Sequence, residues 1–420
     1  MAQTGVEIRY RLALILANHW AEFVATSKRW IRPVVFETVR KILACRTPIL
    51  GCHLYRCSCG ETRVVPHSCK SRFCPRCGKL ATDRWADGVL NDLLDVPYHH
   101  VIVAVPWQLR RVIGFNRSIG LNLIVRAACG CLQQWARDQK GMRLGIVAVL
   151  HTFGADLKWH PHVHLLVTEG GLSLDGTTWV QPYNLGWLIR EASLKKMWRY
   201  HCVRAFRQAH REGAFRWPAN SAYLKKYPCF NKVLSNLYRL TWYAHIGACL
   251  LDAEPTIRYI GRYTKRAVLA EYRITYYDEK VVRFRFKDYA QGGKMSYKTL
   301  PVLAFIGRLI RHIPDKHFKM VRYVGLFAPR WKARYLEQAR AALDQTSQPE
   351  PSSAARRSLL PWRERQIQTL GKDPLLCRIC KRSMRLVGKI FGNHQAVAEY
   401  FEAAGIPTKP YPLAWQPDPG

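Results

Sequence analysis

His160-Pro161-His162-Val163-His164-Leu165-Leu166-Val167-Thr168 carries the strongest structural signal in this chain. In an extended strand successive side chains point to opposite faces, so the three histidines share one face and the aliphatic residues between them share the other. Neighbouring imidazoles on a strand can hold a divalent metal while leaving coordination positions open for a substrate phosphate. The alternative is a strand whose rings are only hydrogen-bonded. Three alternating histidines favour the metal-binding interpretation.

The chain is strongly basic. Its 420 residues include 66 Lys and Arg against 29 Asp and Glu, a formal net charge of +37. Self-repulsion on this scale usually reflects a polyanionic partner, and nucleic acid is the first candidate. A hydrophobic content of 48% indicates a globular protein. No apolar run approaches the roughly 18 residues of a membrane span, and no signal-peptide cleavage site is evident. We therefore expect a cytoplasmic, nucleoid-associated protein that binds DNA and no membrane. A ribosome-like scaffold or a membrane-surface binder fits less well.

Most of the cysteines that could bind metal are crowded into one short segment. Six of the 14 lie between residues 52 and 77, and reduced cytosolic thiols so clustered indicate structural zinc rather than disulfides. Cys74-x2-Cys77 is a regular zinc knuckle, whereas Cys57-x-Cys59 is one residue short. Our preferred ligand set is Cys57, Cys59, Cys74 and Cys77, with Cys69 and His67 as substitutes and Cys52 or His53 less favoured. The isolated Cys377-x2-Cys380 is assigned no function.

A second pattern combines two tyrosines with several cations. The segment 256–266 predicts a helix entered through Pro255. Tyr259 and Tyr263 are one turn apart, so both phenols lie on one face. We expect phosphate contacts from the cations of this segment and of the cysteine-rich one, namely Arg258, Arg262, Lys265, Arg266, Arg72 and Arg76. A tyrosine activated by a metal and by neighbouring cations can serve as a nucleophile on a phosphodiester. Taken alone, two tyrosines at this spacing are more often packing residues of a helix than catalytic residues.

Alternating helix and strand signals predict an α+β fold with helices on one face of a sheet. We expect helices over 1–45, 79–94, 117–139 and 301–313, strands over 99–105, 144–151 and 160–168, and a hairpin over 273–286. The domain prediction is a helical N-terminal region (1–50), a zinc-binding DNA-binding module (51–95), a nuclease domain (96–300) with a helical insertion at about 172–250, a basic C-terminal part (301–343), a linker (344–358) and a tail (359–420).

These motifs together resemble the HUH-type rolling-circle transposases, specifically the insertion-sequence class with an N-terminal zinc-binding domain and two catalytic tyrosines. The matching segments are His162-Val163-His164, the Tyr259/Tyr263 pair, Cys-Lys-Ser-Arg-Phe-Cys-Pro-Arg-Cys at 69–77 and Arg-Tyr-Val-Gly-Leu-Phe at 322–327. They occur in the family's order, over about residues 40 to 340.

The resemblance implies a Rep-like HUH endonuclease fold, in which a ferredoxin- or RRM-like antiparallel sheet is covered by helices. It also implies a reaction: one tyrosine attacks single-stranded or hairpin DNA ends, leaving a 5′-phosphotyrosine and a free 3′-hydroxyl that is later joined to target DNA. Mg²⁺ or Mn²⁺ would be held by His162, His164 and a third ligand, for which His160 ranks slightly ahead of His151 and Asp156. Two alternatives remain: a replication initiator or relaxase using the same chemistry, and a non-enzymatic zinc-ribbon DNA-binding protein.

Overall fold

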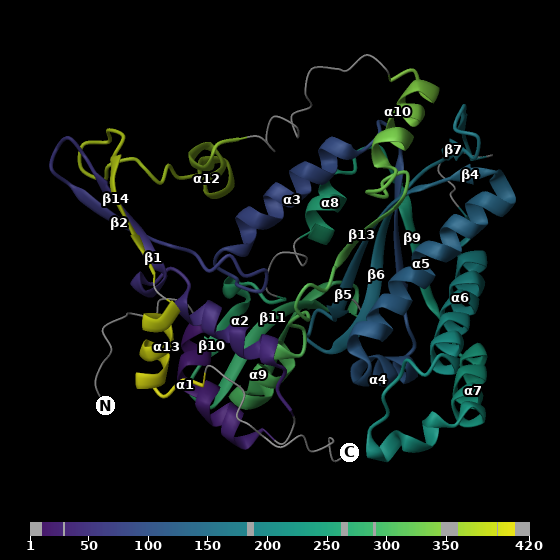
Figure 1. Ribbon diagram of the computed structural model, residues 1–420, viewed down its shortest axis with the longest axis horizontal. Helices are drawn as coiled ribbons and strands as arrows, with labels where there is room; N and C mark the ends of the chain where they lie inside the picture. The colour runs from purple at the N-terminus through teal and green to yellow at the C-terminus, as the bar shows by residue number, and fades with distance from the viewer. Residues whose placement is uncertain are drawn as a thin grey trace.

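The computed structural model describes residues 11–27, 30–182, 189–261, 268–288, 291–345, 360–392 and 394–407. Its centre is a five-stranded sheet in the order β13-β5-β6-β3-β9, in which every neighbouring pair is antiparallel (Figure 1). The strands are β3 (Tyr98–Ala104), β5 (Gly145–Phe153), β6 (Trp159–Thr168), β9 (Tyr243–Leu250) and β13 (Val321–Gly325). The expected mixed α+β architecture with an antiparallel sheet is confirmed.

Helices cover both faces of this sheet, so the expectation of helices on one face is wrong. One face packs against α4 (Trp107–Phe115), α5 (Arg117–Lys140), α6 (Glu191–Arg211) and α7 (Tyr227–Asn236). The other packs against α3 (Gly78–Asp92), α8 (Glu254–Gly261) and α10 (Lys332–Ala342). The physical reason is visible in β5, which is buried at all nine positions and must be covered on both sides.

The predicted strand at 160–168 forms as β6, and its alternation separates the two layers. Val163, Leu165 and Val167 enter the core beneath α5, as expected. Leu166 enters the opposite core with Val147 and Val149 of β5. The central histidines of β6 therefore lie on the face that α3 and α8 cover. This face carries the candidate site.

A second body combines the N-terminal helices with residues 274–310 and with Phe401 of the C-terminal segment. Helices α1 (Arg11–Thr26), α2 (Pro33–Ala44) and α9 (Val302–Ile310) share a core with a sheet of β10 (Ile274–Tyr277), β11 (Val281–Asp288) and β12 (Lys294–Pro301). The predicted hairpin forms as β10 and β11. The expected basic part 301–343 is not one unit, because α9 packs here, while β13 joins the central sheet.

The C-terminal segment folds back onto the N-terminal module. Strand β14 (Arg385–Phe391) pairs with β1 (Gly51–Arg56), which pairs with β2 (Thr62–Pro66), and Figure 1 shows this yellow strand beside the purple hairpin. Two further helices, α12 (Trp362–Leu370) and α13 (His394–Ala403), lie in the same segment. The prediction of a separate tail is therefore wrong. Most of the expected linker (346–358) lies outside the described residues.

The shorter elements complete the chain: β4 (Met142–Arg143), β7 (Gly171–Ser173) and β8 (Trp179–Val180) form a small sheet, and η1 (Pro48–Leu50), η2 (Ala219–Lys225), η3 (Leu237–Arg239) and η4 (Glu271–Arg273) are single 3₁₀ turns or short 3₁₀ helices. The expected helical insertion contains α6 and α7, but its end returns to the central sheet as β9. Within the described ranges, no helix is both long and apolar enough to cross a membrane.

Candidate functional site: a histidine centre and two cysteine clusters

Three histidines meet on the α8-covered face of the central sheet. His162 and His164 come from β6, and His151 comes from the neighbouring strand β5, directly opposite His162. One ring nitrogen of each lies within 4.8 Å of those of the other two. Two adjacent strands thus converge three imidazoles on one point.

Hydrogen bonds orient these rings. His162 Nδ1 lies 2.7 Å from the backbone oxygen of His160, which makes Nδ1 the protonated nitrogen and leaves Nε2 as the lone-pair donor. His164 Nδ1 lies 2.9 Å from Nε2 of His100 on β3. His151 Nε2 lies 3.3 Å from the backbone oxygen of Ile260 on α8. Metal-binding histidines typically use their second ring nitrogen in this way.

Burial keeps these imidazoles neutral. It lowers the pKa of His162 to about 4, and it lowers the pKa values of His151 and His164 well below their usual range. Neutral imidazole is the form that binds a metal. Three nitrogen donors leave open coordination positions, and imidazoles suit Mn²⁺ better than Mg²⁺, which prefers oxygen. The donor set therefore fits a catalytic transition-metal ion.

Tyr259 lies beside this centre. Its ring centroid is 6.2 Å from that of His164 and 6.4 Å from that of His100. Helix α8 buries Ile257 and Ile260 against the sheet, which leaves Tyr259 on the side of the helix, 36% exposed. Because the Tyr259 side chain is partly exposed and close to the histidines, a substrate that reaches the histidines would also reach this phenol.

Several predicted residues fall where the structure makes no statement. Tyr263, Arg262, Lys265 and Arg266 lie outside the described residues. The role of Tyr263 as a second nucleophile therefore stays a prediction from the sequence.

His160 is not part of the histidine cluster. Its backbone oxygen, rather than its ring, serves the site, by holding His162. The register between β5 and β6 shifts between His151 and Phe153, just where His160 would continue the alternation. His151 takes the third position instead. The sequence analysis missed His100, which supports His164 from β3. Its position in the predicted strand 99–105 is the only sequence signal that could have found it.

The cysteines form two clusters rather than one. Cys45, Cys69, Cys74 and Cys77 meet in the core between α2 and α3, and Cys57, Cys59, Cys377 and Cys380 meet beside the β1–β2 hairpin. The preferred set Cys57, Cys59, Cys74 and Cys77 is therefore wrong as a single site, since the structure divides it between the clusters. Cys69, the substitute, belongs with Cys74 and Cys77. His67 Nε2 and His53 Nδ1 lie 3.2 Å apart and form a hydrogen bond.

The predicted ligand set does not include Cys45, which completes the first cluster. Cys45 directly follows a helix and lies 24 residues before the next ligand, Cys69. It caps the C-terminus of α2, and Cys77 caps the N-terminus of α3. The helix N-terminus favours the thiolate form. Cys69 Sγ and Cys77 Sγ are 3.7 Å apart. Four converging cysteines without oxygen ligands fit structural zinc.

Three of the cations expected to contact DNA have partners within the protein. Arg72 donates to the backbone oxygens of Phe318 and Asp315, and Arg76 donates to that of Cys45. Arg258 pairs with Asp87 at 2.9 Å and with Glu254 at 2.7 Å. These side chains hold elements together.

A basic groove of about 660 Å³ runs beside the first cysteine cluster. Exposed Lys70, Lys316 and Lys319 line it together with Trp85 and Tyr323. Trp85 donates a hydrogen bond to the Tyr323 hydroxyl at 3.0 Å. Its ring packs so closely on Gly261, the last residue of α8, that any side chain there would collide with it. Trp85 thus connects this groove to the helix that carries Tyr259.

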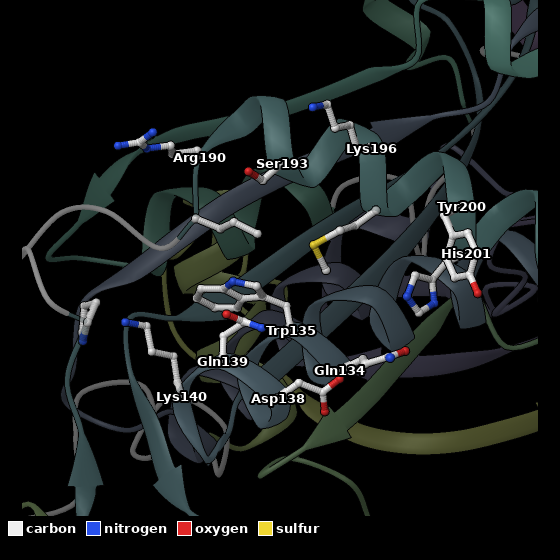
Figure 2. Close-up of a pocket in the computed structure, with 13 residues that line it drawn as sticks. Gln134, Trp135, Asp138, Gln139, Lys140, Arg190, Ser193, Lys196, Tyr200 and His201 are labelled. Atoms are coloured by element: carbon white, nitrogen blue, oxygen red, sulfur yellow. The ribbon is translucent and has the colours of Figure 1, made fainter.

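A second groove, of about 780 Å³, lies between α5 and α6 (Figure 2). Trp135, Lys140, Lys196 and Tyr200 are among the residues that line it, and none of its lining residues belongs to the histidine centre. It is therefore separate from the site built around Tyr259.

Comparison with known proteins agrees with these features. A family model described as "Transposase zinc-binding domain" matches residues 15–105, and one described as "Putative transposase" matches residues 145–334. The chain is 31% identical over 399 residues to "Transposase for insertion sequence element IS801" of Pseudomonas savastanoi pv. phaseolicola, covering 92% of this chain and 93% of the relative.

It is also 30% identical over 350 residues to "Putative transposase y4qJ" of Sinorhizobium fredii, covering 83% of this chain and 87% of the relative. No solved structure matches the chain. The first family model covers Cys45 and the cysteines between 52 and 77, whereas Cys377 and Cys380 lie beyond both models. The chain belongs to the HUH-type insertion-sequence transposases with an N-terminal zinc-binding domain, the family of the IS801 transposase.

Proposed function

We propose that this transposase cleaves and rejoins single-stranded DNA through a covalent 5′-phosphotyrosine intermediate, with Tyr259 as a nucleophile beside a metal centre of His151, His162 and His164. The observation that carries the proposal is the distance of 6.2 Å between the rings of Tyr259 and His164. It supports a Rep-like HUH assignment for the central sheet, in which the histidine strand lies in the middle and the tyrosine helix lies across it.

In the cleavage step the Tyr259 oxygen loses its proton to solvent and forms a bond to phosphorus, while the bond from phosphorus to the 3′ oxygen breaks. The upstream strand leaves as a free 3′-hydroxyl after taking up a proton. The downstream strand stays on the tyrosine through its 5′ phosphate. A divalent ion at the histidine centre would withdraw charge from the scissile phosphate. Attack by a 3′-hydroxyl on the phosphotyrosine reverses the step, so strand transfer needs no ATP.

The protein's own groups prepare this chemistry. The carbonyl of His160 and the ring of His100 fix the orientation of the two β6 histidines before substrate arrives. The carbonyl of Ile260, next to Tyr259 in α8, contacts His151. One hydrogen bond therefore ties the helix of the nucleophile to the metal centre, which keeps the two in register.

We infer that the basic groove beside the first cysteine cluster guides the DNA. Lys70, Lys316 and Lys319 are exposed along it, and Trp85 and Tyr323 offer aromatic surfaces. Cations that follow a backbone, together with stacking rings, are what single-stranded DNA needs. Trp85, which lines the groove, packs on Gly261 at the end of α8, so we infer that a strand leaving the groove past Trp85 would approach Tyr259. The zinc-bound module would then fix one wall of the DNA path.

The test is a covalent-adduct assay with Mn²⁺ and single-stranded oligonucleotides from candidate element ends. A 3′-labelled oligonucleotide should become attached to protein in a denaturation-resistant adduct, and a 5′-labelled one should be shortened and stay free. Tyr259→Phe should remove the adduct that Tyr259 forms and leave any adduct that Tyr263 forms. The double variant Tyr259→Phe with Tyr263→Phe should form no adduct. Tyr297→Phe, an exposed tyrosine on β12, is the matched control and should retain it.

The outcomes separate the alternatives. No adduct with any oligonucleotide, or an adduct that survives loss of both Tyr259 and Tyr263, would contradict the tyrosine mechanism. Adduct formation and nicking without joining to a second strand would favour the replication-initiator or relaxase alternative. DNA binding without adduct would leave the zinc-ribbon DNA-binding protein as the function.

A further inference from the structure

We propose that Cys57, Cys59, Cys377 and Cys380 bind a second structural Zn²⁺ ion, which clasps the C-terminal segment 375–391 onto the β1–β2 hairpin. This site is separate from the cluster inside the zinc-binding family match, because half of its ligands come from beyond residue 370. It does not depend on the proposed reaction at Tyr259.

The sulfur atoms already converge. Cys57 Sγ lies 3.3 Å from Cys380 Sγ, and Cys59 Sγ lies 3.7 Å from Cys377 Sγ. All four lie within 4.8 Å of one another. Each pair is contributed by one chain turn, so the ligands arrive as two knuckles, the usual way of building a tetrahedral zinc site.

Backbone hydrogen bonds shape both knuckles. In the first, Gly60 N–H donates to the Cys57 carbonyl at 3.0 Å, and Cys57 N–H donates to the backbone carbonyl of Glu61 at 2.8 Å. In the second, Cys377 N–H donates to the backbone carbonyl of Arg382 at 2.9 Å across the turn. Lys381 there has a φ of 59°, a left-handed conformation that a knuckle turn needs and a lysine adopts only at some cost. The two turns are therefore prepared for convergence before any metal is considered.

The surrounding core is too small to explain this convergence. It comprises four buried side chains, of which two are cysteine ligands: Tyr55, Cys57, Cys377 and Met384. Strand β14 is exposed at six of its seven positions, and its middle residue is only half-buried. Modules with so little apolar burial usually need a metal or disulfides to fold. The first cluster differs, since it lies within a large shared core.

The donor set selects the ion. Four sulfur ligands with no oxygen or nitrogen favour zinc among the common metals, because thiolates are soft ligands and zinc accepts tetrahedral geometry.

Other contacts also hold the C-terminal segment on the protein, but they anchor a different part of it from the proposed zinc ion. Arg365 of α12 pairs with buried Asp87 of α3 at 2.9 Å, and Arg63 donates to the Pro374 carbonyl at 3.0 Å. These anchors lie before residue 375 in the tail. After β14, Phe401 of α13 is buried in the core that α1 and α2 share. Between these anchors β14 depends on its ladder with β1, which the metal would lock at one end. Loss of the ion should therefore loosen 375–391 and the hairpin while α12 stays docked.

The experiment measures zinc per chain in full-length protein purified under reducing conditions. It uses a His162→Ala/His164→Ala background, so that the histidine centre cannot add to the count. We expect two zinc ions per chain, falling to one in Cys377→Ser/Cys380→Ser and to one in Cys57→Ser/Cys59→Ser. Cys229→Ser, a cysteine outside both clusters on α7, is the thiol-count control and should keep two.

Hydrogen exchange supplies a readout that does not depend on the variants folding well. Chelation of the His162→Ala/His164→Ala protein, with all cysteines in place, should release one zinc ion first, because Cys59 is exposed whereas Cys74 is fully buried. Exchange should then rise in 51–66 and 375–391 and stay unchanged in α1 and the central sheet. One zinc ion per chain in the background protein, two ions retained without Cys377 and Cys380, iron in place of zinc, or a Cys57–Cys380 disulfide under reducing conditions would each overturn the proposal.

Discussion

His151 on β5 lies directly opposite His162 on β6 in the central antiparallel ladder. The pairing brings together two residues that the sequence separates by a full hairpin. It also supplies what a strand alone lacks, a third imidazole from a neighbouring strand at the same height. The histidine centre is thus a property of strand register.

Replacing His151 tests the composition of this centre. His151→Ala removes one of three imidazoles, so Mn²⁺ affinity should fall by at least the roughly 10–100-fold that loss of a supporting residue costs. His160→Ala should change Mn²⁺ affinity little, because its ring nitrogens are not among the converging donors and the substitution keeps the backbone oxygen that holds His162. Titration followed by electron paramagnetic resonance measures both. Equal losses in the two variants would return His160 to the ligand set.

His100 tests the supporting role. Its Nε2 lies 2.9 Å from His164 Nδ1, so His100→Phe removes a hydrogen bond while leaving the three ligands in place. We expect Mn²⁺ affinity to fall by about 10–100-fold. The zinc content should not change, because no residue of β3 belongs to either cysteine cluster. Unchanged Mn²⁺ affinity would mean that packing alone orients His164.

The sequence predicts the parts of this site that are local. The alternation at 160–168 indicates the strand and its two faces, and Pro255 indicates the start of the helix that carries Tyr259. These signals depend on neighbours within a few residues. They hold because each strand or helix imposes its own period on the side chains.

What the sequence leaves out is pairing between distant segments. Cys57 and Cys380 are 323 residues apart, and no spacing rule connects them. The cysteine prediction joined the nearest knuckles in the sequence, whereas the fold joins Cys57 with the tail. Likewise Arg258 looks available for DNA in a helix rich in cations, but it is bound by Asp87 of α3. Charge partners of this kind come only with tertiary structure.

The basic groove carries the third prediction. Changing Lys70, Lys316 and Lys319 together to Gln should weaken binding of single-stranded DNA and lower the slope of log affinity against log salt by about 2, at about 0.7 per phosphate contact. Fluorescence anisotropy at several salt concentrations measures this. The control changes three exposed lysines on η2, on α7 and between them to Gln: Lys225, Lys226 and Lys232. A control that lost as much affinity would show that net charge, rather than the groove, binds DNA.

Asp87 carries the last prediction, on stability. It is buried between α3, α8 and α12, and its two oxygens pair with Arg258 and Arg365, each at 2.9 Å. Arg365 is only 2% exposed, so Asp87→Ala would leave a buried guanidinium without this carboxylate and should destabilise the protein by about 3–5 kcal/mol. Glu254→Ala removes only the exposed partner of Arg258 and should cost less than about 1 kcal/mol. Urea denaturation followed by tryptophan fluorescence compares the two midpoints. Equal midpoints would mean that Arg365 finds another partner or reaches water once Asp87 is gone.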